Sequence, residues 1–588
     1  MDEIENGADE GPEHWAERPF LLAGLGLATG IAVHLLLGNM PSYQIEWSAL
    51  QLALLIGVTL FAAAIGFTIE RRRWWASILF AAVVGVAAGL VTWWNGAPTD
   101  WSASEIWRTL SLLLAVAIAA PLFQAARDEG APRTPYAAVH DYAWTNVVLW
   151  CACWLFVLIS FLMLWLLASL FQLIKIDLLH DLLMENWFWR ALIGLAFGGA
   201  LGLLREHDAV VRLLQRVVAT VLAVLAPVLA AGLALFLLAL PFTGLQALWD
   251  ATSQTTPLLL SCAMGALILA NAVIGNRSEE ERRSPPLRFG AVTLALVLLP
   301  LAILAAVATG LRVSQYGYTP ERLWAIVFVG IAILYGAAYL GSLILGRLEW
   351  TAKVRPANLM LAFAICGLGL VLATPLISFN RISTEDQLAR LKDGRTKLER
   401  FDWKALAFDF GQPGKNALAR LSQSTDPKVK APAQQAMAAK NRWDFPENRP
   451  VRADRKQEVL ANARILPAGA ALPPGLAEEM NEYTCTRDRP CTVFVSGPGE
   501  AFQLADNCFE DGSRQRADSK GLSGGYCAGG TRYALVDGKW QTATDSRGLS
   551  AAQWAQVAAA YPAGKAEVRK VERRQLFIGG VPVGDVFE

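Results

Sequence analysis

The stretch ANLMLAFAICGLGLVLATPLISFN, residues 357–380, is the last long apolar run in the chain. About 20 consecutive apolar residues are enough for a helix to cross the hydrocarbon core of a bilayer. From Arg381 to Glu588 the sequence is polar and contains no second run of that length. Residues 357–380 are therefore predicted to form the final membrane crossing. The side of the membrane on which this crossing ends decides where the C-terminal region lies.

The composition of the whole chain is typical of a membrane protein. Of its 588 residues, 54% are hydrophobic and 18% are charged, whereas soluble domains average about 25% charged residues. The net charge is +1, without the basic excess that marks nucleic-acid-binding domains. The lipid bilayer is therefore the predicted partner, and the charge argues against nucleic acid.

Eleven apolar segments are long enough to be transmembrane helices. They cover roughly residues 19–38, 47–69, 74–94, 105–126, 143–173, 187–204, 216–241, 256–275, 289–311, 323–346 and 357–379. The acidic residues before the first segment lack the basic leader and cleavage site of a secretory signal. Residues 1–18 are therefore predicted to be an N-terminal tail, and residues 19–380 a transmembrane helical domain.

The distribution of Lys and Arg predicts the orientation, because short cytoplasmic loops carry an excess of both. The even-numbered loops hold 14 of them: Arg71, Arg72, Arg73, Arg127, Arg133, Arg205, Arg212, Arg277, Arg282, Arg283, Arg288, Arg347, Lys353 and Arg355. The odd-numbered loops hold three: Lys175, Arg312 and Arg322. The N-terminus is predicted to be cytoplasmic, so the eleventh crossing delivers the C-terminal region to the outside.

Cysteine usage is an independent indication of compartment. Four of the eight cysteines lie in the C-terminal region, at Cys485, Cys491, Cys508 and Cys527. An even number of cysteines in an extracytoplasmic domain indicates disulfides. Four cysteines allow three pairings, of which Cys485–Cys491 with Cys508–Cys527 is the favoured one. A zinc site is the alternative, but the close C-x-x-C pairs typical of such sites are missing.

The apolar segments contain almost no ionisable residue at mid-membrane, where such groups mark ion or proton pathways. The neutral polar residues Asn146, Asn271 and Ser261 are expected to hydrogen-bond between helices. A water-filled cavity at mid-membrane that is lined by any of the three would instead indicate a transporter of a neutral or lipid-like substrate.

The loop at residues 175–186 is amphipathic. Its Asp177, His180 and Asp181 share one face of a helix, and an interfacial helix with that face in water is the expected structure. Convergence of these side chains with Glu321 in one outer cleft would instead indicate a membrane-embedded transferase that uses outer-loop carboxylates.

Residues 381–475 are predicted to be a periplasmic helical region with a linker. Ser383 and Asp386 approximate a capping box at its first helix. Phe401, Trp403, Phe408 and Phe410 form an aromatic cluster close to the last crossing, and are candidates for a contact between this region and the membrane domain. A local core and a ligand groove are the other structures that this cluster predicts.

Residues 476–588 are predicted to be a disulfide-bonded α+β domain with a small antiparallel sheet. Turn residues at Asp537-Gly538 and Gly579-Gly580 each separate two short β-type runs, as in hairpins. Residues 550–561 are predicted to form a helix between these hairpins. The fold class is thus a polytopic α-helical membrane protein of about 11 helices with a C-terminal α+β extracytoplasmic domain.

The loop between the ninth and tenth segments departs from the charge pattern, because two arginines lie on its predicted outer side. Thr319, Pro320 and Glu321 make a good helix start there. The loop is a candidate interaction surface that includes Arg312, Tyr316, Tyr318, Glu321 and Arg322.

The same loop lies in LRVSQYGYTPERLWAIVFVGIAILYGAAYL, residues 311–340, which resembles a signature of the bacterial multi-pass family known as domain of unknown function 4153. Residues 242–273, RISTEDQLARLKDG at 381–394 and FDWKALAFDFGQPGKNALARL at 401–421 are similar to other parts of that family. The resemblance covers most of residues 20–425. It implies a bacterial inner-membrane protein and carries no established activity.

Catalytic motifs are missing from the sequence, including H-E-x-x-H, G-x-S-x-G and the P-loop. All five histidines precede residue 208, which argues against a triad or an imidazole metal site in the C-terminal region. We therefore predict no cofactor, no metal and a non-catalytic role. The expected function is an inner-membrane protein that presents a periplasmic domain for binding, sensing or envelope assembly, with an envelope protein as partner.

Overall fold

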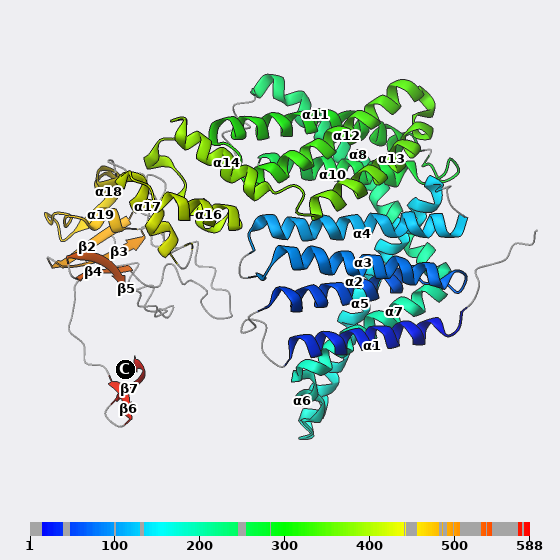
Figure 1. The fold of residues 1–588 in the computed structure, drawn as a ribbon, viewed down its shortest axis with the longest axis horizontal. Helices are drawn as coiled ribbons and strands as arrows, with labels where there is room; N and C mark the ends of the chain where they lie inside the picture. Colours follow the sequence, from blue (N-terminus) through cyan, green and yellow to red (C-terminus); the bar gives the residue numbers. More distant parts are fainter. Residues whose placement is uncertain are drawn as a thin grey trace, which may run out of the picture. The chain divides into compact units, whose positions relative to one another are not determined.

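The structure, a computed structural model, describes residues 15–38, 47–98, 101–129, 134–244, 255–282, 284–439, 442, 455–480, 485, 491–497, 499–505, 531–536, 538–543, 574–578 and 581–587. The chain divides into two compact units, Met1–Phe445 and Pro446–Glu588. Figure 1 shows the long helices of the first unit and the strands of the second. The predicted helix at residues 550–561 and the cysteines Cys508 and Cys527 lie outside the described residues.

Eleven helices among the described residues are long and apolar enough to cross a membrane. They are α1 (Arg18–Leu37), α2 (Ala49–Thr68), α3 (Trp74–Asn95), α4 (Ala103–Glu129), α5 (Tyr136–Leu173), α7 (Asn186–Glu206), α8 (Asp208–Thr243), α10 (Thr255–Ile274), α11 (Pro285–Tyr316), α12 (Pro320–Gly346) and α13 (Trp350–Ala373). Each predicted segment coincides with one of them. The predicted class of polytopic α-helical membrane protein is therefore confirmed.

Helices α1 and α7 lie in backbone contact through glycines. A Cβ atom at Gly26 would lie 1.9 Å from the carbonyl oxygen of Gly194, and one at Gly198 would lie 2.1 Å from that of Leu22. No side chain larger than hydrogen fits at these positions, so the glycines set the distance between the two helices. The spacing of four residues between Gly194 and Gly198 thus serves packing.

One end of the membrane block is held together by partly buried ion pairs. Arg18 on α1 pairs with Glu70, which follows α2, and its Nε lies 3.2 Å from Glu206 Oε1 at the end of α7. Arg205 pairs with the same Glu70 and donates to the carbonyl oxygen of Gly66 at 2.6 Å. These contacts fasten α1, α2 and α7 to one another.

The final crossing ends earlier than predicted. Helix α13 stops at Ala373, and the chain turns before α14 (Phe379–Lys392) begins. Pro375 lies in this turn, where its missing N–H cannot continue a helix. The predicted capping box at Ser383 is wrong, because Ser378 is the N-cap of α14 and its side chain accepts a hydrogen bond from Arg381 N.

Three short helices follow α14 in the first unit: α15 (Trp403–Phe408), α16 (Gly411–Leu421) and α17 (Pro427–Ala438). Phe401, Trp403 and Phe410 are 1–2% exposed and form a core with Leu406 and Leu418. Phe408 is only partly buried at the edge of this core. We call α14–α17 the helical cap.

The second unit contains a five-stranded sheet of order β1 (Ala463–Leu466), β2 (Cys491–Gly497), β3 (Glu500–Ala505), β4 (Thr531–Val536) and β5 (Lys539–Ala543). Strand β1 runs parallel to β2, so the sheet is mixed rather than antiparallel as predicted. Short helices α18 (Arg455–Asn462) and α19 (Leu476–Glu479) accompany it, and β6 (Arg574–Ile578) pairs with β7 (Val581–Phe587) in a separate hairpin. The predicted α+β character of the C-terminal region is confirmed.

Candidate functional site

Helix α14 binds the end of α11 and the loop that follows it. Arg390 Nη2 donates to the carbonyl oxygens of Ser314 and Gln315 at 3.1 and 2.9 Å. These carbonyls belong to the last turn of α11, where no intrahelical donor remains and a cation is favourable. A side chain of α14 thus supplies the C-terminal cap of α11.

Two further side chains of α14 bind the backbone of the same loop. Asp386 Oδ2 accepts from Tyr318 N at 2.8 Å, and Gln387 Nε2 donates to the carbonyl oxygens of Tyr316 and Tyr318 at 2.9 and 3.0 Å. Gly317 between them has φ +77°, and a Cβ there would lie 2.5 Å from Asp386 Oδ2. Glycine is therefore required for this close approach.

The predicted interaction loop is thus brought against the helical cap through α14. Tyr316 remains 61% exposed, and the Arg322 guanidinium lies 5.4 Å from the centre of its ring. Arg322 also donates to the carbonyl oxygen of Gly317 at 2.8 Å, and Arg312 is exposed. The described hydrogen bonds between cap and loop come from α14, whereas the aromatic residues predicted to contact the membrane domain fill the core of the cap.

A buried polar cluster joins α14 to α4. Asn380, which is 2% exposed, donates to Glu105 Oε1 at 2.9 Å, and the same carboxylate lies 3.7 Å from Arg108 Nη1. Asn95 at the end of α3 donates to the carbonyl oxygen of Glu105. No local pattern in the sequence indicates this cluster, since its residues are up to 285 positions apart in numbering (Asn95 to Asn380).

Asp409 lies in the turn between α15 and α16. Burial raises the pKa of its carboxyl group, and the nearby carboxylates of Asp402 and Glu321 raise it further, while Arg442 opposes this shift. Glu321 belongs to the first turn of α12, so Asp409 is affected by a charge of the membrane block.

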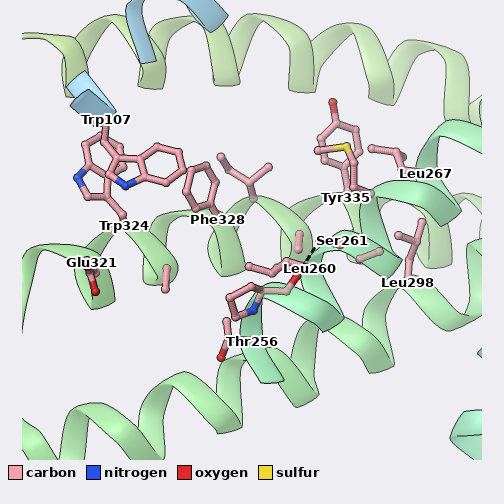
Figure 2. Close-up of a pocket in the computed structure, with 16 residues that line it drawn as sticks. Trp107, Thr256, Leu260, Ser261, Leu267, Leu298, Glu321, Trp324, Phe328 and Tyr335 are labelled. Carbon is pink, nitrogen blue, oxygen red and sulfur yellow. Dashed lines mark hydrogen bonds between the residues drawn. The ribbon is translucent and has the colours of Figure 1, made fainter. Parts of the chain in front are cut away.

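A groove of about 720 Å³ runs between α10 and α12. Leu298 of α11 contributes to its lining, and Trp107 of α4 lies at one end, where it packs on Trp324 and Phe328. Figure 2 shows these aromatic rings and Glu321 at one end of the groove, and Tyr335 and Leu267 at the other. The residues between the two ends are almost all apolar.

The neutral polar residues of the membrane helices are used in hydrogen bonds. Asn146 donates to Gln124 Oε1 at 2.8 Å, and Asn271 donates to the hydroxyl of Tyr339 at 2.7 Å. Ser261 bonds within its own helix, to the carbonyl oxygen of Pro257, and not between helices as predicted. Of the three, Ser261 lines the groove between α10 and α12, and Asn146 and Asn271 are engaged in hydrogen bonds between helices.

The side chains considered for a transferase do not converge. Helix α6 (Leu178–Met184) carries His180 and Asp181 and packs on α5 and α7, where His180 lies against the Trp165 ring. Figure 1 shows α6 at the edge of the first unit opposite α12, which carries Glu321. In the described parts of the chain, no three His, Cys, Asp or Glu side chains are placed to hold a metal ion.

In the second unit, the Sγ atoms of Cys485 and Cys491 lie at bonding distance, with Cα atoms 4.8 Å apart. Both residues are buried in the core beside Val493 and Tyr533. The pairing favoured for these two cysteines is thus compatible with the geometry.

Comparison with known proteins identifies one family. No curated protein and no solved structure shows significant similarity to the chain. The family described as "Domain of unknown function (DUF4153)" matches residues 35–421, more than half of the chain, from the end of α1 to the end of α16. The matched region therefore includes α2 to α13 of the membrane block and most of the helical cap, and the chain, a multi-pass membrane protein, belongs to this family.

Proposed function

We propose that this protein is a bacterial inner-membrane protein that presents a periplasmic region for binding, sensing or assembly at the cell envelope. Its N-terminus would lie in the cytoplasm. The excess of Lys and Arg in the even-numbered loops supports this orientation. The helical cap and the second unit follow α13 and would lie on the periplasmic side.

The observation that carries the proposal is the attachment of α14 to the membrane block. Asp386, Gln387 and Arg390 bind backbone groups of the α11–α12 region, and Asn380 binds the buried Glu105. Polar groups buried in this way fix one arrangement, because an unpaired partner would be costly. The membrane block therefore holds the cap in a defined position, as a binding or assembly platform requires.

The surface offered to an envelope protein partner includes the exposed side chains of the interaction loop. Tyr316 and the neighbouring Arg322 form an aromatic–cation pair, and Arg312 lies beyond them on α11. Tyrosine and arginine are enriched at the energetic centres of protein interfaces. The Tyr316 backbone is bound by Gln387 of α14, so its exposed side chain remains for recognition.

A periplasmic location also fits the buried Cys485 and Cys491, since disulfides persist in oxidising compartments. The pair is proposed to be a disulfide, and the pairing of Cys508 with Cys527 remains a prediction.

Two engineered cysteine pairs test orientation and attachment together. Tyr318→Cys with Gln387→Cys should form a disulfide in growing cells without added oxidant, because the two side chains belong to contacting segments in the periplasm. The control, Thr351→Cys with Glu281→Cys, joins residues whose side chains are 3.0 Å apart at the other end of the block. It should cross-link only after oxidant is added to isolated membranes. The reverse pattern would refute the orientation.

Alkaline phosphatase fusions give a second readout of orientation, because the enzyme is active only where its own disulfides form. A fusion after Val583 should be active, and one after Asn276, in the loop between α10 and α11, should be inactive. An inactive fusion at Val583 would remove the proposed periplasmic role.

The groove between α10 and α12 favours a second function, the handling of a lipid-like substrate. Transport would require access from both sides of the membrane. Glu321 lines the end of the groove near α14, and the interior of the groove is apolar. The groove therefore supports binding of an amphiphile more directly than translocation of a polar solute.

A further inference from the structure

The groove between α10 and α12 has the size of a small-molecule site. Its volume of about 720 Å³ falls within the roughly 300–1,000 Å³ that such sites occupy. It lies along helices that cross the membrane, so hydrocarbon chains of lipids are the surrounding medium. The shape and location together predict an elongated apolar ligand taken from the bilayer.

The interior of the groove offers no unused hydroxyl from its two small polar residues. The Ser261 hydroxyl donates to the carbonyl oxygen of Pro257 at 2.8 Å, and Thr256 shares a hydrogen bond with Thr309 at 3.1 Å. Leu260, Leu267 and Phe328 complete this part of the lining. A hydrocarbon chain can pack on this apolar surface without leaving polar groups unpaired, whereas a polar substrate would lose its hydrogen bonds to water there.

The end of the groove beside α14 differs in chemistry. Trp324 is 3% exposed, and its indole Nε1–H has no hydrogen-bond partner among the described residues. A buried donor without an acceptor is costly, so this group calls for a ligand oxygen. The Trp107 ring, 5.9 Å away between centroids, packs against Trp324 and keeps this end of the groove apolar up to the indole.

Glu321 also lines this end of the groove, one helical turn before Trp324. Its negative charge favours a cationic group and disfavours a second anion. Arg322 is attracted electrostatically by Glu321, but its hydrogen bond goes to the carbonyl oxygen of Gly317 in the loop. The site therefore favours a ligand that carries both an acceptor oxygen and a positive charge.

We propose that this groove binds one phospholipid with an ammonium head group, drawn from the surrounding bilayer. One hydrocarbon chain lies between α10 and α12, an ester or phosphate oxygen accepts from Trp324 Nε1, and the ammonium group pairs with Glu321. The site goes beyond the proposed envelope role and does not depend on which side of the membrane α14 lies.

Native mass spectrometry of the full chain can test this site. The protein is purified in the presence of equal amounts of dioleoyl phosphatidylethanolamine and dioleoyl phosphatidylglycerol, whose chains are identical and whose head groups differ in charge. One phosphatidylethanolamine should be retained in preference to phosphatidylglycerol. Equal retention, preference for phosphatidylglycerol, or no retained lipid would overturn the proposal.

Substitutions assign the binding to the groove. Trp324→Phe removes the donor but keeps an aromatic ring, and Glu321→Gln removes only the charge. Glu321→Gln should lower the ratio of retained phosphatidylethanolamine to phosphatidylglycerol by about two- to tenfold, the effect of one polar contact of ordinary strength. Trp324→Phe should lower the retained amount of both lipids by a similar factor, because both carry the acceptor oxygen. Ala332→Phe places a ring in the lining and should abolish retention of the single lipid.

Matched controls separate specific binding from the lipid shell around any membrane protein. Trp187→Phe and Glu185→Gln make the same chemical changes at the start of α7, away from the groove. Both should retain lipid as the unmodified protein does. Size-exclusion profiles should match for all variants, and equal losses in the groove variants and the controls would show that the groove is not the site.

Discussion

At the residue scale, Asp386 is the side chain on which the attachment of α14 most depends. It accepts from the backbone N–H of Tyr318 at 2.8 Å, and a hydrogen bond to a charged group is worth about 1.5–3 kcal/mol. Asp386→Ala should lower the stability of the detergent-purified protein by that amount in thermal unfolding. Glu385→Ala is the matched control, since Glu385 is 64% exposed and pairs with the exposed Arg381; it should cost less than about 1 kcal/mol.

Asp409 predicts a pH dependence whose sign follows from its raised pKa. Burial is the main cause of the shift, which the Asp402 and Glu321 carboxylates increase. The folded protein therefore keeps this proton at pH values where the unfolded chain has lost it. The stability contributed by Asp409 is greatest below its ordinary pKa of 3.8 and falls as pH rises through the raised value.

The comparison that tests this is Asp409→Asn, which cannot titrate. Unfolding of both proteins is followed between about pH 4 and pH 7. The variant should gain stability relative to the unmodified protein as pH rises across this range. A constant difference would mean that the ion pair with Arg442 fully offsets the burial of the carboxylate.

Residue-level prediction from sequence succeeded where the partner is close in the chain. Thr319 as N-cap of α12 was predicted, and its side chain accepts from Arg322, three residues later. The contact between Asp386 and Tyr318 spans 68 residues, and no local pattern indicates it. Asp386, Gln387 and Arg390 do share one face of a helix, but the sequence alone did not show what that face meets.

At the scale of elements, the packing of α1 on α7 predicts unequal effects of the same substitution at two α1 glycines, Gly24 and Gly26. A Cβ at Gly26 would overlap the carbonyl oxygen of Gly194, whereas one at Gly24 would meet nothing within 4 Å. Gly26→Val should force the helices apart and destabilise the protein by at least the roughly 1–3 kcal/mol typical of overpacked sites. Gly24→Val, with the same change in helix propensity, should leave thermal stability within about 0.5 kcal/mol. Equal effects of the two variants would contradict the close packing.

The same scale explains why the helices could be predicted and the sheet only in part. Hydrophobic length is a local property, so all eleven crossings were found, with α13 ending at Ala373 instead of near residue 379. Hairpin turns are local as well, and β4–β5 and β6–β7 formed as expected. The parallel pairing of β1 with β2 joins strands separated by a long connection, and no turn signal marks it.

At the scale of the whole molecule, the division after Phe445 predicts that the membrane block and helical cap are stable without the second unit. All contacts of α14 described above lie within Met1–Phe445, and the core of the second unit is built from its own residues, including Tyr533 and Trp540.

A chain that ends at Phe445 should insert, purify as a single species and show the same loss of stability on Asp386→Ala as the full chain. A chain that ends at Ser378 removes the cap and leaves Glu105 without Asn380, so it should be less stable. Dithiothreitol should alter the unfolding of the full chain alone, because Cys485 and Cys491 lie in the second unit. Aggregation of the chain ending at Phe445 would show instead that the cap depends on the second unit, and that the two units fold as one.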